Sequence, residues 1–143
     1  MAGPEPLPID PSDFDAVGVL SDVVVTLRAH VMATDTDAGA TISAPEGWHH
    51  AKVTAKPGGS SVLQVRYGEL SMSRLRNVAD ALHGRGWQLD EDGEGATLRQ
   101  PPGTPATDVA FELLAVIGVA GAPSSVRSVT AVDADGRPLD LTP

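Results

Sequence analysis

Carboxylates recur at alternate positions in three short stretches, a spacing that could place oxygen ligands around a calcium ion. The stretches are Asp35/Asp37, Asp90/Asp92/Glu94 and Asp133/Asp135. In the segment 90–95, Gly95 falls at the sixth position, but an EF-hand loop needs a glutamate at position twelve, which here is Pro101. The flanking residues also have the pattern of strands. We therefore interpret this segment as an acidic hairpin turn.

Histidines offer the next set of possible metal ligands. His49 and His50 are neighbours on a predicted strand, so their side chains point to opposite faces and cannot chelate one ion. His30 and His83 lie near the ends of predicted helices, where an imidazolium suits the helix dipole. The chain has no cysteine, which excludes disulfides and thiolate metal sites. We expect no metal.

Serine and glycine motifs do not predict catalysis either. The segment Gly58-Gly59-Ser60-Ser61 lacks the Gly-x-Ser-x-Gly elbow of serine hydrolases. The segment Gly84-Arg85-Gly86 leads into a predicted strand, so it lacks the helix N-terminus that holds phosphate. We expect no catalytic residue, no cofactor and no enzymatic activity.

Charge narrows the possible partners. Ten basic residues stand against nineteen acidic ones, which gives a net charge of −9. This balance argues against nucleic acid and against anionic membranes as partners.

Residues 1–11 hold four prolines and no basic residue, so we expect a flexible tail and not a signal peptide. We also expect no stretch of membrane-spanning length, and a cytoplasmic location.

Apolar spacing predicts three helices. The first, over 13–32, has Ser12 as its cap and a stripe at intervals of three and four: Phe14, Val17, Leu20, Val24, Leu27 and Val31. The β-branched run 23–26 favours a strand instead, but the length and the six matched positions favour a helix. The second helix covers 72–83, capped by Ser71 and ended by Gly84 or Gly86.

The third helix covers 105–117. It begins after Thr104 with Pro105, and we expect Gly118, Gly121 and Pro123 to end it. Its apolar stripe is Ala106, Val109, Ala110, Leu113, Val116 and Ile117.

Alternating patterns and turn residues predict strands at 40–44, 48–55, 61–67, 87–89, 96–100 and 126–132. Residues 45–47 and 57–59 form turns between the first three, and Leu63, Val65 and Tyr67 face inward. The order is α-β-β-β-α-β-β-α-β. It predicts an α+β fold, with an antiparallel sheet of five to six strands and three helices. We expect one domain over 12–136 and a short tail over 137–143.

Some apolar residues lie off the main helix stripes, among them Val25 in the first helix. They can be buried between sheet and neighbouring elements, or they can form a groove or a subunit interface. The candidate partner-binding residues are Val19, Val23, Leu75, Val78, Leu82, Phe111 and Leu114.

Several segments together resemble a known family. Val62-Leu63-Gln64-Val65 precedes the helix Leu75–Leu82, Arg85-Gly86-Trp87 and an acidic hairpin follow, and a later helix ends near Val116-Ile117-Gly118-Val119. This order, over about residues 13–132, resembles the bacterial secretion-chaperone-like superfamily, with its type III secretion chaperones, YbjN-like proteins and actinobacterial peptide-binding relatives. The aromatic residues often seen there around the middle strand and second helix are sparse in this chain.

The resemblance implies a small, acidic, non-enzymatic protein that holds a partner polypeptide, often as a dimer. A chaperone-like binding module is therefore our first hypothesis. A regulatory or structural homodimer without peptide-binding activity is the second. A small hydrolase or metal-dependent enzyme ranks last.

Overall fold

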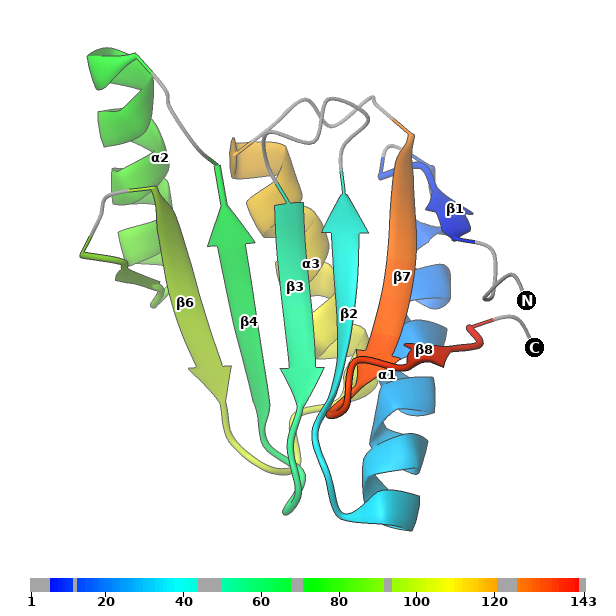
Figure 1. Ribbon diagram of the computed structural model, residues 1–143. Helices are drawn as coiled ribbons and strands as arrows, with labels where there is room; N and C mark the ends of the chain where they lie inside the picture. Colours follow the sequence, from blue (N-terminus) through cyan, green and yellow to red (C-terminus); the bar gives the residue numbers. More distant parts are fainter. Residues whose placement is uncertain are drawn as a thin grey trace.

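The computed structural model describes residues 6–11, 13–43, 50–67, 71–91, 94–120 and 126–141. An antiparallel sheet of eight strands carries three helices on one face, and no described helix covers the other (Figure 1). The elements, in chain order, are β1 (Leu7–Ile9), α1 (Ala16–Thr34), β2 (Ala38–Ser43), β3 (His50–Ala55), β4 (Ser61–Arg66), α2 (Met72–Gly84), β5 (Gln88–Leu89), β6 (Gly95–Gln100), α3 (Ala106–Ala120), β7 (Arg127–Asp133) and β8 (Pro138–Leu139). The predicted α+β class is confirmed.

The strand order β1-β7-β2-β3-β4-β6-β5 brings the two ends of the described chain together. Strand β7 pairs with β2 on one side, and on its other side with both β1 and β8. Leu7 lies opposite Val129, and Leu139 lies opposite Ala131. The two short strands thus cover successive parts of the same edge.

The register gives the sheet one apolar and one polar face. Ala40, Val53 and Leu63 are directly opposite one another and buried beneath the helices. The neighbouring positions form a polar row across the other face: Thr41, Lys52, Gln64 and Thr97. This alternation is typical of an antiparallel sheet with one solvated face. The inward orientation predicted for Leu63, Val65 and Tyr67 is confirmed by their burial.

Helices α1 and α3 pack against each other and cover the centre of the sheet, while α2 lies at the edge beside β5 and α3 (Figure 1). The α3 side chains at the core are those of the predicted stripe: Val109, Ala110, Leu113, Val116 and Ile117. The run 23–26 is helical, so the competing strand interpretation is wrong there. Burial of one helix face outweighs the strand preference of β-branched residues.

The chain ends differ from the expected tails. Leu7–Ile9, placed in a flexible tail over 1–11, form β1, and Ile9 is only 4% exposed. Pro138–Leu139, placed in a tail over 137–143, form β8. The sheet therefore has eight strands instead of five to six. Each of these two segments is too short to show alternation, and β7 supplies the edge on which they pair.

The helix ends agree in part with those predicted from the sequence. Ser71 Oγ accepts a hydrogen bond from the Arg74 N–H at 3.4 Å and caps α2, as predicted. Helix α1 begins at Ala16, three residues later than expected, and α3 continues through Gly118. Thr104, which the sequence places directly before the third helix, uses its hydroxyl to donate to the carbonyl oxygen of Pro101 at 2.8 Å.

Some sequence predictions concern residues outside the described ranges. These are the cap at Ser12, the turn at 45–47, the start of the strand at Trp48, the face of His49, the carboxylate of Asp92, and the helix stops at Gly121 and Pro123.

Helix α1 contradicts the expectation about membrane-spanning length. Its 19 residues have a mean hydropathy of 1.5, which is long and apolar enough to cross a bilayer. A third of this stretch is buried inside the protein, and both core helices of soluble proteins and signal sequences near the N-terminus meet the same criterion. One such helix is therefore weak evidence for a membrane.

Candidate functional site

The outward side of α1 carries an unusual amount of exposed apolar surface. We define the α1 outer face by Gly18, Val25, Ala29 and Met32, which project within an arc of about 60° at helical spacing, together with Phe14. The side chains of Phe14, Val25 and Met32 are 95%, 55% and 88% exposed. Phe14 lies in the turn directly before the helix. The core-facing side chains occupy the opposite side of α1.

A groove runs beside the first half of this face, between α1, β1 and the last described residues. It has a volume of about 400 Å³ and is lined by Leu7, Val19, Asp22, Val23, Val25, Thr26 and Leu141. We call it the α1–β1 groove. Two of the candidate residues, Val19 and Val23, therefore meet in one cleft. Val23 is only 2% exposed and lies at its base, while Val19 is half-buried.

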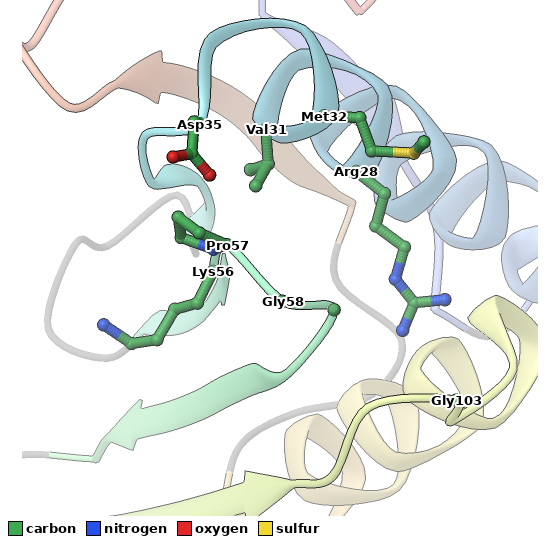
Figure 2. A pocket seen from close by; sticks show the side chains of 9 residues that line it. Arg28, Val31, Met32, Asp35, Lys56, Pro57, Gly58 and Gly103 are labelled. Carbon is green, nitrogen blue, oxygen red and sulfur yellow. The ribbon is translucent and has the colours of Figure 1, made fainter.

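A second cleft of about 400 Å³ lies at the other end of α1, against the β3–β4 turn and the loop that precedes α3 (Figure 2). Arg28 and Met32 contribute from α1, and Lys56 and Gly103 contribute from the two loops. An Arg28 Nη2–H group donates to the carbonyl oxygen of Thr104 at 2.8 Å.

The two cations at this cleft do not converge. The Lys56 ammonium is paired with an Asp37 carboxylate oxygen at 3.2 Å, and the side chains of Arg28 and Lys56 point away from each other (Figure 2). The cleft therefore does not direct two cations at one bound group.

Together the two clefts flank the α1 outer face. Val25 belongs to the outer face and also lines the α1–β1 groove, and Met32 likewise lines the second cleft. Each cleft is thus bordered by one exposed apolar side chain of the outer face.

The other candidate residues do not join this surface. Val78 and Leu82 on α2 are 3% and 0% exposed, so they are core residues and not a contact surface. Leu75 and Leu114 are partly buried and pack against the core. Phe111 on α3 is 61% exposed and lines none of the described clefts. Helix α2 is short, and Val78 and Leu82 are its buried residues.

A charged cluster fixes the end of α2 on α3. One carboxylate oxygen of Glu112 accepts from Trp87 Nε1 at 2.7 Å and from Arg85 Nε at 3.0 Å, and the other accepts from Arg85 Nη2 at 2.8 Å. Burial raises the pKa of Glu112, but the hydrogen bonds from Arg85 and Trp87 outweigh burial and lower it overall. Ionised Glu112 is thus a structural link.

The acidic hairpin likewise has a structural explanation. Arg66 on β4 lies 3.4 Å from an Asp90 carboxylate oxygen and 3.2 Å from one of Glu94. The Thr97 hydroxyl donates to the other Asp90 oxygen at 3.2 Å. Within the described ranges, no three side chains of His, Asp or Glu gather as metal ligands.

Sequence reasoning missed part of the exposed surface. Phe14 was assigned to the buried stripe of the first helix, and that assignment is wrong, because α1 begins only at Ala16. Met32 was not singled out, although its spacing of seven from Val25 places both on one helix face. Leu7 and Leu141 had no local signal, because only the pairing at the β7 edge brings the two termini to α1.

Comparison with family models, curated proteins and solved structures gives no match for this chain.

Proposed function

We propose that this protein is a chaperone-like, non-enzymatic binding module that holds a partner polypeptide against the α1 outer face. One observation carries the proposal: three large apolar side chains of the α1 outer face are exposed, and one of them, Val25, also lines the α1–β1 groove. Exposed apolar patches of this kind mark interaction sites. The resemblance to secretion chaperones and the net charge of −9, which favours solubility, support the same function.

The energetic argument comes from the exposed fractions. Fully burying one such side chain contributes about 1.5–3 kcal/mol of free energy. A partner that covers Phe14, Val25 and Met32 would therefore gain several kcal/mol of binding free energy. Part of this binding free energy is offset by the entropy lost on association and on ordering side chains. A partner that also fills the α1–β1 groove adds the burial of Leu7 and Leu141.

The partner segment is best described as an amphipathic helix. The alternative, an extended segment that adds to the sheet beside β1, is disfavoured because Pro6 and Pro8 interrupt the backbone donors at that edge. An apolar helix face laid along α1 needs no backbone donor from either side.

The charged groups at the second cleft do not form a converging pair. The Lys56 ammonium is neutralised by Asp37, and its side chain points away from Arg28 (Figure 2). A structural or regulatory homodimer without peptide-binding activity is the second candidate, because a second copy would cover the same exposed apolar side chains.

Titration with a synthetic amphipathic helical peptide of zero net charge, followed by methyl NMR of the full chain, tests the proposal. We expect shifts at Val19, Val25 and Met32, and loss of binding in Val25→Asp. The matched control is Val132→Asp, at a valine 39% exposed on β7. Binding that is equal in both variants, or shifts confined to other elements, would contradict the proposed surface.

A further inference from the structure

We propose that the face of the sheet away from the helices binds an acidic polypeptide segment. We call it the open sheet face and define it by the row Thr41, Lys52, Gln64 and Thr97, together with the residues two positions before and after each of them. It is the side turned toward the viewer in Figure 1. This surface is separate from the α1 outer face, so the inference goes beyond the proposed function.

The charge of the open sheet face is opposite in sign to that of the whole chain. Lys52, Arg66 and Arg99 lie on this face, and none of its residues is an aspartate or a glutamate. The whole chain has a net charge of −9. At physiological salt the Debye length is about 8 Å, so exposed charges farther away than this are largely screened. The local positive charge therefore decides what approaches the face.

A histidine on the same face reports the sign of this local charge. His50 lies directly opposite Arg66 in the register of β3 and β4. Burial, followed by repulsion from Arg66 and Lys52, lowers the pKa of His50. The two cations thus disfavour a further positive charge beside them, and an anionic group would be stabilised there.

Two of the three cations have no acidic partner in the described part of the chain. Arg66 is paired with Asp90 at 3.4 Å and with Glu94 at 3.2 Å. Among the described residues, neither Lys52 nor Arg99 makes an ion pair or a side-chain hydrogen bond. Lys52 and Arg99 can therefore pair with carboxylates of another molecule.

The carboxylates at the border of the face are engaged with other groups. Asp37 and Asp133 share a shallow hollow of about 200 Å³ with Lys52. Asp37 is paired with Lys56 at 3.2 Å. One oxygen of Asp133 accepts from two backbone N–H groups of the following turn, both at 2.9 Å. The face therefore keeps its positive character up to this border.

The spacing of the two cations suits an extended polypeptide. Lys52 and Arg99 lie two strands apart and are offset by two residues, which places their Cα atoms about 12 Å apart. Carboxylates four residues apart on one side of an extended chain are separated by about 14 Å, so long side chains can join both pairs. The face has no Phe, Tyr or Trp on which nucleic acid bases could stack, which favours a polypeptide.

A synthetic peptide of alternating Glu and Ser is the probe, and the same peptide with Gln in place of Glu is its control. Each is titrated into the ¹⁵N-labelled full chain at physiological salt. We expect amide shifts at Thr41, Lys52 and Gln64 with the Glu peptide only. Lys52→Gln and Arg99→Gln should each weaken binding about two- to fivefold, and the factors should multiply in the double variant. Arg76→Gln, at an exposed position on α2, is the matched control and should leave the affinity unchanged.

Several results would overturn the proposal. Equal binding of both peptides or binding of neither would do so, and so would an equal loss of affinity in Arg76→Gln and Lys52→Gln. Tighter binding of single-stranded oligodeoxythymidine to the same residues would overturn the choice of a polypeptide. Val25→Asp should bind the Glu peptide as the parent does. A failure at the α1 outer face and a failure at the open sheet face are thus distinguishable.

Discussion

Replacing Glu112 by alanine should destabilise the protein by a defined amount. Trp87 is 2% exposed, and its indole N–H donates to Glu112 at 2.7 Å, so the substitution leaves a buried donor without that partner. Such a loss costs about 1–3 kcal/mol. The Arg85 side chain is 42% exposed, and its ion pair adds at most about 1 kcal/mol. We expect a total loss of about 2–3 kcal/mol in the free energy of unfolding.

Urea and thermal unfolding monitored by Trp fluorescence and circular dichroism measure this loss. For a chain of this length it corresponds to a decrease in Tm of roughly 6–9 °C. Glu112→Gln keeps an oxygen that can accept from Trp87 and should cost about half as much. Arg85→Ala removes only the exposed partner and should cost less than about 1 kcal/mol. The reasoning is refuted if Arg85→Ala is as damaging as Glu112→Ala.

The lowered pKa of Glu112 also predicts a pH dependence. Burial opposes ionisation, but the hydrogen bonds from Arg85 and Trp87 prevail and hold the pKa of Glu112 below its ordinary value. The ionised carboxylate therefore stabilises the folded state above the pKa of the unfolded chain. This contribution is lost as the pH falls through the folded pKa. The stability difference between the parent and Glu112→Gln should narrow over that acidic range, and a difference that widens there contradicts the assignment.

Gly95→Ala should lower the free energy of unfolding by at least about 2 kcal/mol, because the new Cβ would lie 2.5 Å from the Val65 carbonyl oxygen. Gly84→Ala is the matched control in the last turn of α2, with nothing within 4 Å, and should stabilise by about 0.5–1 kcal/mol. Burial, followed by repulsion from Arg66 and Lys52, lowers the pKa of His50. NMR titration should find its midpoint below that of an exposed histidine, and Lys52→Met should raise it.

The parts of the fold that the sequence predicted are those with long periodic patterns. The stripe of α3 from Val109 to Ile117 matches its buried face, and the central strands pair as expected because their alternation is regular. The Ser71 cap and the hairpin that joins β5 to β6 were also predicted, since both depend on local turn chemistry.

What the sequence could not predict depends on contacts between distant segments. The pairing of Leu7–Ile9 and Pro138–Leu139 with β7 has no local signal, because each segment is too short to show a period. The candidate surface was found only in part. Val19 and Val23 do meet in a groove, but the exposure of Phe14 depends on where α1 begins. A helical pattern alone does not reveal which of two apolar sides faces the sheet.

Oxidation of the unmodified protein tests most directly whether a polypeptide covers the α1 outer face. Met32 on this face and Met72 on α2 are 88% and 79% exposed in the single chain, so hydrogen peroxide should oxidise both at similar rates in a dilute monomer. Mass spectrometry of digested samples that received rising concentrations of the synthetic amphipathic helical peptide follows each methionine separately. The account predicts that Met32 becomes protected while Met72 stays reactive. Equal oxidation of the two methionines at every concentration would contradict it.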